Sequence, residues 1–442
     1  MSINQNMVTR GMTVTLAGMG VNLCLGVLYS WGAFQGVLVL EPFSWTSTQT
    51  QIPYMLACLI FAVLMVPAGR LQDKIGPRTV ILISGVTALT GLVLSGLFIT
   101  PLGLSISFGI VFGLAMGFGY AAPTPAAIKW YGLHKRGLIS GIVVSGFGLA
   151  GMYIAPLSNY LLANFGIEQT FMIFGVAYGI IIVLLALAIS NPPAGYIPTP
   201  PPAHIAAKFA AKAKRPVVDW HWKQMIKTPQ FFFLWGMFCI GTFAGLLIIG
   251  QLRRIGIEQA SLTDNLAFWL IAIYALFNWA GRIVCGFIAD KIGFRRTLLG
   301  LFVLQFVVFA MFTTLNTAVP LFIGTAIVAF AFGGMLTIFP TLTANYFGVK
   351  NLGVNYGLVF TAWGGGGVFG PLLGGLVRDL TGTFAVAYII SAVLSLVGVI
   401  LAATMKSPKG VWLEEEQSKP ESDKQLRKLT ENYVKAGTAG KN

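Results

Sequence analysis

The sequence predicts an all-α polytopic membrane protein with twelve transmembrane helices in two pseudo-symmetric six-helix bundles. The 442 residues are 56% hydrophobic and only 10% charged, with a mean hydropathy of +0.79, whereas soluble domains contain about 25% charged residues. Apolar runs of about 18 residues or more recur along the chain, and helices of that length cross a hydrocarbon core of roughly 30 Å. Two motifs also recur at nearly one offset, which indicates a duplicated six-helix unit.

Hydropathy places the twelve spans in order along the chain. Each span is interpreted as a helix, because lipid offers no hydrogen-bond partner to an open backbone. The predicted ranges are 11–37, 48–70, 78–100, 102–128, 137–163, 167–190, 230–252, 264–288, 297–315, 319–345, 353–377 and 384–405. Thr228 and Pro229 predict the start of the seventh helix, because threonine caps helix N-termini and proline is favoured at the first helical position.

A long polar interval, rich in proline and then in lysine, divides the spans into two sets of six. We therefore predict four segments. They are an N-terminal six-helix bundle (1–190), a cytoplasmic linker (191–228), a C-terminal six-helix bundle (229–405) and a cytoplasmic tail (406–442).

The net charge of +15 follows from membrane topology. Of the 29 Lys and Arg residues, only Arg253, Arg254 and Arg378 fall on the side opposite to the termini and the linker, and Arg282 lies within a span. The positive-inside rule then places both termini in the cytoplasm and the protein in a cytoplasmic-type, inner cell membrane. Basic loops beside anionic lipid headgroups account for the charge, so the lipid bilayer is the expected partner and nucleic acid is not.

The residue types for metal, cofactor or catalytic chemistry are not grouped in this sequence. The four cysteines lie within apolar spans and have no CxxC spacing, which is typical of small buried hydrophobic residues. The spans contain no cluster of metal ligands, no carboxylate pair and no histidine with a nucleophile. We therefore expect no metal and no cofactor, and we do not expect an enzyme.

A ten-residue motif after the second span returns after the eighth. Residues 69–78 match residues 286–295 at six of ten positions, 217 residues later, and a second pair of motifs, 130–141 and 346–357, recurs at an offset of 216. Glycine permits a tight turn between helices, and aspartate can accept hydrogen bonds at a neighbouring helix N-terminus. We expect the first motif to stabilise a conformational gate; a loop that only sets topology is the alternative. The candidate gate residues are Gly69, Asp73, Lys74, Arg78, Gly286, Asp290, Lys291 and Arg295.

The duplicated motif resembles the major facilitator superfamily over residues 11–405. This resemblance implies a secondary transporter whose two bundles rock about a central site, so that a small solute crosses by alternating access. Four local sequences are more narrowly similar to the branch of monocarboxylate transporters and oxalate–formate antiporters. They are residues 26–31, 129–141, 227–231 and 278–282.

Arg282 is the one charged residue predicted deep inside a span. An unpaired guanidinium that faces a water-filled cavity is a site for a carboxylate, and the resemblance implies that Arg282 binds the carboxylate of the substrate. The alternative is a structural arginine that packs on a backbone carbonyl. Asn278, one helical turn earlier, either orients the guanidinium and donates to the substrate or forms a hydrogen bond between helices.

Aromatic and small residues on other spans complete the candidate site, with ordinary helix packing as the alternative for each. They are Leu28, Tyr29, Tyr120, Ser145, Phe332, Phe360 and Trp363. In the similar oxalate carrier a lysine of span 11 binds a second carboxylate, and Trp363 occupies that position here.

A single cation favours a substrate with one carboxylate, because a second buried carboxylate would be unpaired. We therefore expect a lactate- or pyruvate-like monocarboxylate that is carried together with a proton. Animal monocarboxylate carriers have an aspartate at the position of Asn278, so anion antiport of the oxalate–formate type stays an alternative. Export of an uncharged solute is another.

Overall fold

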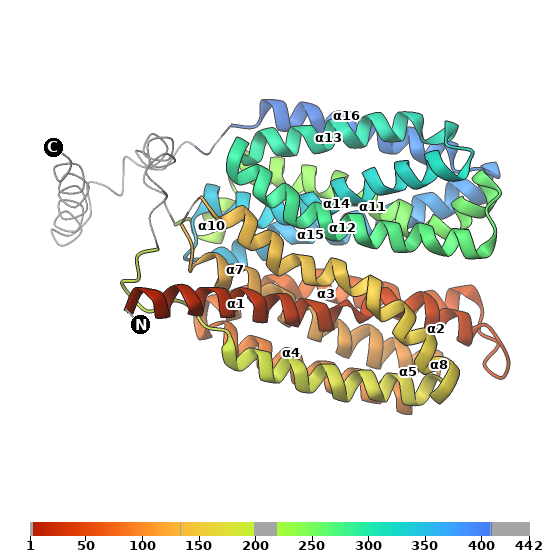
Figure 1. Ribbon diagram of the computed structural model, residues 1–442, viewed down its shortest axis with the longest axis horizontal. Coiled ribbons are helices and arrows are strands. Elements are labelled where there is room, and N and C mark those ends of the chain that lie inside the picture. The colour runs from red at the N-terminus through yellow and green to blue at the C-terminus, as the bar shows by residue number, and fades with distance from the viewer. Residues whose placement is uncertain (1–2, 133, 199–218, 407, 409–442) are drawn as a thin grey trace. The chain divides into compact units, whose positions relative to one another are not determined.

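Helices account for every regular element in the described part of the chain, residues 3–132, 134–198, 219–406 and 408 (Figure 1). The structure is a computed structural model. Residues Met1–Met405 form one compact unit. Nearly all of the predicted tail and much of the predicted linker lie outside the described residues.

The long helices lie side by side (Figure 1). The first half contains α1 (Ile3–Leu25), η1 (Gly26–Ser30), α2 (Trp31–Leu38), α3 (Ser47–Ile75), α4 (Pro77–Leu97), α5 (Pro101–Leu104), η2 (Ser105–Phe112), α6 (Gly113–Ala121), α7 (Pro123–Ile128) and α8 (Arg136–Ala188). The second contains α10 (Trp222–Met225), α11 (Pro229–Ala260), α12 (Asp264–Ile292), α13 (Phe294–Met311), η3 (Phe312–Thr314), α14 (Ala318–Phe347), α15 (Leu352–Thr381) and α16 (Ala385–Thr404).

Eleven segments among the described residues are long and apolar enough to cross a membrane. The predicted span 353–377 is not one of them, although α15 covers it with 30 residues, or about 45 Å of helix. Its run of four glycines, 364–367, lowers the mean hydropathy of the segment, but the helix continues through them. The predicted break between the fifth and sixth spans is confirmed, because α8 consists of two helices joined at Gly166, where φ is 76°.

Local sequence sets several helix starts. Thr228 accepts a hydrogen bond from the Phe231 N–H and Pro229 occupies the first turn of α11, so the predicted cap is confirmed. Gly76 and Gly293 separate the paired helices of the two repeated motifs, with φ of 88° and 99°. Only glycine adopts such angles without strain, which explains the tight turn expected from the motif.

Asp73 joins the end of α3 to the start of α15, in the other half of the chain. Its carboxylate accepts hydrogen bonds from the N–H groups of Gly353 (3.1 Å) and Val354 (2.9 Å). Lys129 Nζ lies 3.9 Å from the same carboxylate. Burial lowers the pKa of Lys129, and the charge of Asp73 opposes that shift. Asp73 lies in the last turn of α3, and Lys129 follows α7 directly. We call the end of the helices at which α3, α7, α12 and α14 finish the basic end.

Asp290 makes the equivalent contact in the opposite direction. Its carboxylate accepts from the N–H groups of Gly137 (2.9 Å) and Leu138 (2.8 Å) at the start of α8. The repeat places Asn345 where the first half has Lys129, and Asn345 Oδ1 lies 3.5 Å from a guanidinium nitrogen of Arg136. Each half therefore contributes one carboxylate that binds a helix start of the other half. Among the described ion pairs, a lysine accompanies Asp73 but not Asp290.

Two motif glycines permit the close approach of the halves. A Cβ on Gly69 would collide with the carbonyl oxygen of Gly353, and a Cβ on Gly286 would collide with that of Gly137. Backbone therefore packs against backbone where each carboxylate meets its helix start. These glycines serve the interface between the halves and not the turn, which belongs to Gly76 and Gly293.

The motif arginines bind within their own halves. Arg78 donates to the Leu187 carbonyl (2.8 Å), and Arg295 donates to the carbonyls of Ala402 (2.9 Å) and Ala403. Each arginine therefore caps the carbonyl end of the last span of its half. Lys74 and Lys291 are exposed, and the ammonium of Lys291 lies 4.1 Å from the ring centre of Phe287. A gating role for these four cations stays a prediction.

Replacing Gly69 with alanine should separate the halves at the basic end, because the added methyl group has no room against Gly353. The test is a distance distribution between spin labels at positions 74 and 350, in a background without native cysteines. We expect a longer-distance population in Gly69→Ala. Gly236→Ala is the matched control, since nothing lies within 4 Å of a Cβ there. Identical distributions for Gly69→Ala and its parent would contradict the tight interface.

Candidate functional site

Arg282 lies in the middle of α12 and is only 1% exposed. Its Nε donates to Asn278 Oδ1 at 2.9 Å, one turn earlier on the same helix. Its Nη1 donates to the carbonyl of Val144 on α8, in the other half. The guanidinium therefore bridges the two halves.

This burial differs from the expected water-filled cavity around the guanidinium. Gly148 explains the difference, since a Cβ there would lie 2.8 Å from Asn278 Oδ1 and 2.9 Å from Arg282 Nε. Its missing side chain lets α8 close over the arginine. Packing on a backbone carbonyl, the alternative considered for Arg282, is thus present in this state of the molecule.

The arginine has no carboxylate partner among the described ion pairs. Asn278 Nδ2 is buried and has no hydrogen-bond partner. A buried unpaired donor costs about 1–3 kcal/mol, and an unpaired cation costs more. The site therefore contains a guanidinium and a free Asn278 N–H group, and its own acceptors do not satisfy all of these donors.

Tyrosines from several helices surround this charge. The hydroxyls of Tyr29, Tyr120, Tyr274 and Tyr356 are close enough to interact electrostatically with Arg282. Tyr274 is held by its own hydrogen bond to the Gly245 carbonyl, at 2.9 Å. Hydroxyl groups can both donate and accept, so they suit a polar ligand in an apolar wall.

Six aromatic rings from both halves pack together beside the tyrosines. We call this group the aromatic box; it consists of Tyr29, Phe61, Tyr120, Phe147, Phe360 and Trp363. Tyr120 contacts Phe360 across the halves, with ring centres 5.2 Å apart. Trp363 stacks on Phe360 at 5.4 Å and is 6% exposed. Four of the predicted site residues are thus brought together.

The other three predicted residues lie outside the box. Ser145 donates to the Ile142 carbonyl on its own helix (2.8 Å), so its hydroxyl hydrogen is already used. The ring of Phe332 packs on Gly245 and lies 6.4 Å from that of Tyr274, within the second half. Leu28 is buried in the apolar core. For these residues the observed contacts are those of helix packing.

Sequence reasoning missed Phe61, Phe147, Gly148 and the Val144 carbonyl. The two phenylalanines belong to no motif and are hidden among the 33 in the chain. The carbonyl has no side-chain signal at all. The spacing Gly141-x6-Gly148 on the fifth span was the available sign of a close helix approach.

No group of three or more His, Cys, Asp or Glu residues in the described part of the chain is placed to hold a metal ion. The four cysteines are free thiols, within or beside the apolar core. The residues of this site can bind an anion or a polar solute. They include no recognisable nucleophile with a base.

Several proteins with similar sequences have names that describe transporters. The chain is 31% identical to the uncharacterized MFS-type transporter YhjX of Escherichia coli K12 over 348 residues, which cover 78% of this chain and 82% of YhjX. It is 29% identical to the oxalate:formate antiporter of Oxalobacter formigenes over 385 residues (85% and 87%). It is 23% identical to monocarboxylate transporter 13 of Rattus norvegicus over 346 residues (75% and 74%).

The fold is shared with solved transporters and the family assignment is direct. The E. coli fucose:proton symporter FucP, in its outward conformation, superposes with a TM-score of 0.66 at 16% identity, over 88% of this chain and 97% of FucP. The family model described as Major Facilitator Superfamily matches residues 12–256 and 257–436. Because this match extends over most of the sequence, the chain belongs to the Major Facilitator Superfamily of membrane transporters.

Proposed function

We propose that this transporter carries a short monocarboxylate, of the lactate or pyruvate kind, together with a proton. The observation that supports this proposal is Arg282, a buried cation without a described carboxylate partner. A guanidinium binds a carboxylate through two parallel hydrogen bonds. The names of two relatives, an oxalate:formate antiporter and a monocarboxylate transporter, point to the same class of ligand.

The geometry suggests how binding is linked to movement of the halves. Arg282 Nη1 donates to the Val144 carbonyl of the opposite half. A substrate carboxylate that takes this donor breaks a bond between α12 and α8. Part of the binding energy then loosens the contact that covers the site. The substrate therefore binds more tightly to a state in which α8 and α12 have separated, and alternating access requires such a difference in affinity between states.

The aromatic box favours a small substrate with one charge. Trp363 fills the position where the similar oxalate carrier has a lysine, and its neighbours Phe360 and Phe61 are apolar. A second carboxylate at this place would be buried without a partner. The hydroxyls of Tyr29 and Tyr120, with the free Asn278 N–H, suit the 2-hydroxy or 2-keto oxygen of the substrate and a path for the proton.

Anion exchange is the second candidate function. The antiporter of Oxalobacter formigenes matches 85% of the chain at 29% identity, and Asn278 offers no carboxylate to carry a proton. Proteoliposomes separate the two modes. Symport predicts uptake of labelled L-lactate that an inward-acid gradient accelerates into empty vesicles, whereas exchange requires vesicles preloaded with an anion and ignores the gradient.

Replacing Arg282 with glutamine should lower the initial rate of L-lactate uptake by at least about 30-fold. Loss of one partner of a buried charged pair costs about 2 kcal/mol or more. Arg296→Gln is the control, because Arg296 is an exposed arginine of α13 outside the site. Size-exclusion profiles and melting curves check that each variant is folded. Full lactate uptake by folded Arg282→Gln would refute the proposed role of this arginine, and uptake only of an uncharged solute would refute the carboxylate.

Replacing Gly148 with alanine should weaken lactate transport by about 10-fold without removing any charge. The new methyl group would displace the pair formed by Arg282 and Asn278, and such overpacking costs about 1–3 kcal/mol. Gly151→Ala, three residues along α8, is the matched control, since its Cβ would lie at an ordinary 3.4 Å from Ala275. We expect a raised KM for Gly148→Ala alone. Equal kinetics for the two variants would argue against the arginine and its asparagine as the binding pair.

Replacing Trp363 with lysine should extend binding to dicarboxylates. The added ammonium lies among the rings of the aromatic box, where a second carboxylate becomes its partner. We expect oxalate to compete with labelled L-lactate at least 10-fold better in Trp363→Lys than in the parent. Trp363→Met keeps an apolar side chain there and serves as the control. Unchanged competition by oxalate in the folded variant would show that position 363 does not set the number of charges.

A further inference from the structure

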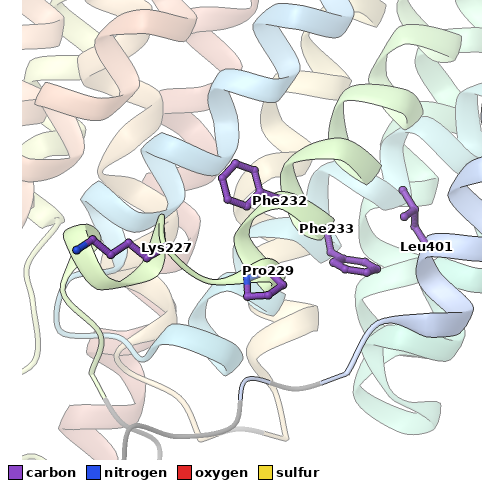
Figure 2. Close-up of a pocket in the computed structure, with 5 residues that line it drawn as sticks. All are labelled: Lys227, Pro229, Phe232, Phe233 and Leu401. Atoms are coloured by element: carbon purple, nitrogen blue, oxygen red, sulfur yellow. The ribbon is translucent and has the colours of Figure 1, made fainter.

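A groove lies at the basic end between the start of α11 and the end of α16. It has a volume of about 470 Å³ and is lined by Lys227, Pro229, Phe232, Phe233 and Leu401. The five side chains form a row with Lys227 at one end and Leu401 at the other (Figure 2). Phe232 is 62% exposed, so this aromatic wall is not covered by the rest of the protein.

The groove crosses the boundary between polar and apolar surroundings. The membrane-spanning part of α11 begins at Pro229, so Phe232 and Phe233 lie within its first two turns. Lys227 precedes Pro229 by two residues. The segment before it is held at the basic end, because the Trp220 N–H donates to the Phe347 carbonyl at 2.9 Å. Lys227 thus stands at headgroup level at one end of the groove, and its ammonium points away from Phe232 and Phe233 (Figure 2).

A second cation lies beside the other end of the groove. Arg295 donates to the carbonyls of Ala402 and Ala403, which follow Leu401 directly, and its side chain is exposed. The five lining residues include one lysine and no carboxylate. The groove therefore attracts negative charge at its rim and apolar groups along its wall.

We propose that this groove binds one anionic phospholipid from the leaflet at the basic end. The headgroup phosphate lies beside Lys227, and an acyl chain follows Phe232, Phe233 and Leu401. A soluble anion would have no apolar group to cover Phe232 and Phe233. A zwitterionic lipid has no net charge, so the cations beside the groove would not favour it. This site shares no residue with the Arg282 region and does not depend on the proposed substrate.

Native mass spectrometry of the full chain, released from detergent with added lipid, tests the proposal. We expect the wild type to retain one phosphatidylglycerol at least about 5-fold more than phosphatidylcholine, the preference of about one lysine near an anionic headgroup. Lys227→Gln should weaken this preference, because only Arg295 then remains beside the groove. Lys223→Gln is the matched control, because Lys223 is an exposed lysine of α10 that does not line the groove.

Two further measurements separate the parts of the site. Phe232→Ser should lower retention of both lipids, because it removes the more exposed part of the apolar wall. Melting curves check that this variant is folded. Excess glycerol phosphate should not displace the lipid. Equal retention of both lipids by the wild type, an unchanged preference in Lys227→Gln, or displacement by glycerol phosphate would each overturn the proposal.

Discussion

Two carboxylates that reach across to helix starts hold the halves of this transporter together. Asp73 accepts N–H groups at the start of α15, and Asp290 accepts those at the start of α8. The first N–H groups of a helix have no partner within it, and the helix dipole favours negative charge at that end. Parting the halves would expose both carboxylates and all of these donors together, so the closed basic end is strongly defined.

The same pair of helices, α8 and α12, carries the Asp290 contact and the candidate site. On α12, Arg282 precedes Asp290 by about two turns, and on α8, Val144 follows Gly137 by about two turns. Asp290 bonds the start of α8, and Arg282 bonds the carbonyl of Val144 on that helix. Any change in the spacing of these two helices therefore affects both contacts. Under the proposed function, a ligand that takes the guanidinium from Val144 removes one of the contacts between these two helices.

Much of the fold follows from local sequence signals. Hydropathy located the spans, including α15, whose glycines make it the least apolar, and Thr228 with Pro229 located the start of α11. The repeated motifs predicted an aspartate at a neighbouring helix start, and that contact is present. They did not say which helix, because a carboxylate can bind the N-terminus of any helix that packs nearby. Only the packing of the helices decides that the aspartates of the first motif bind the N–H groups of Gly137 and Gly353, which belong to the second motif.

The sequence by itself determined that this chain is a duplicated bundle of membrane helices with one deeply placed arginine. These features follow from the hydrophobic composition, from the repeated motifs and from the position of one residue within a span. All of these can be obtained from the sequence without knowing how the helices pack. Only the tertiary structure decided that Arg282 is buried against the Val144 carbonyl, and that Tyr120 and Phe360 meet from different halves. Backbone carbonyls carry no sequence signal, and contacts between residues more than a hundred positions apart depend on how closely glycines let helices approach. The arginine was thus predictable, whereas its surroundings followed from packing.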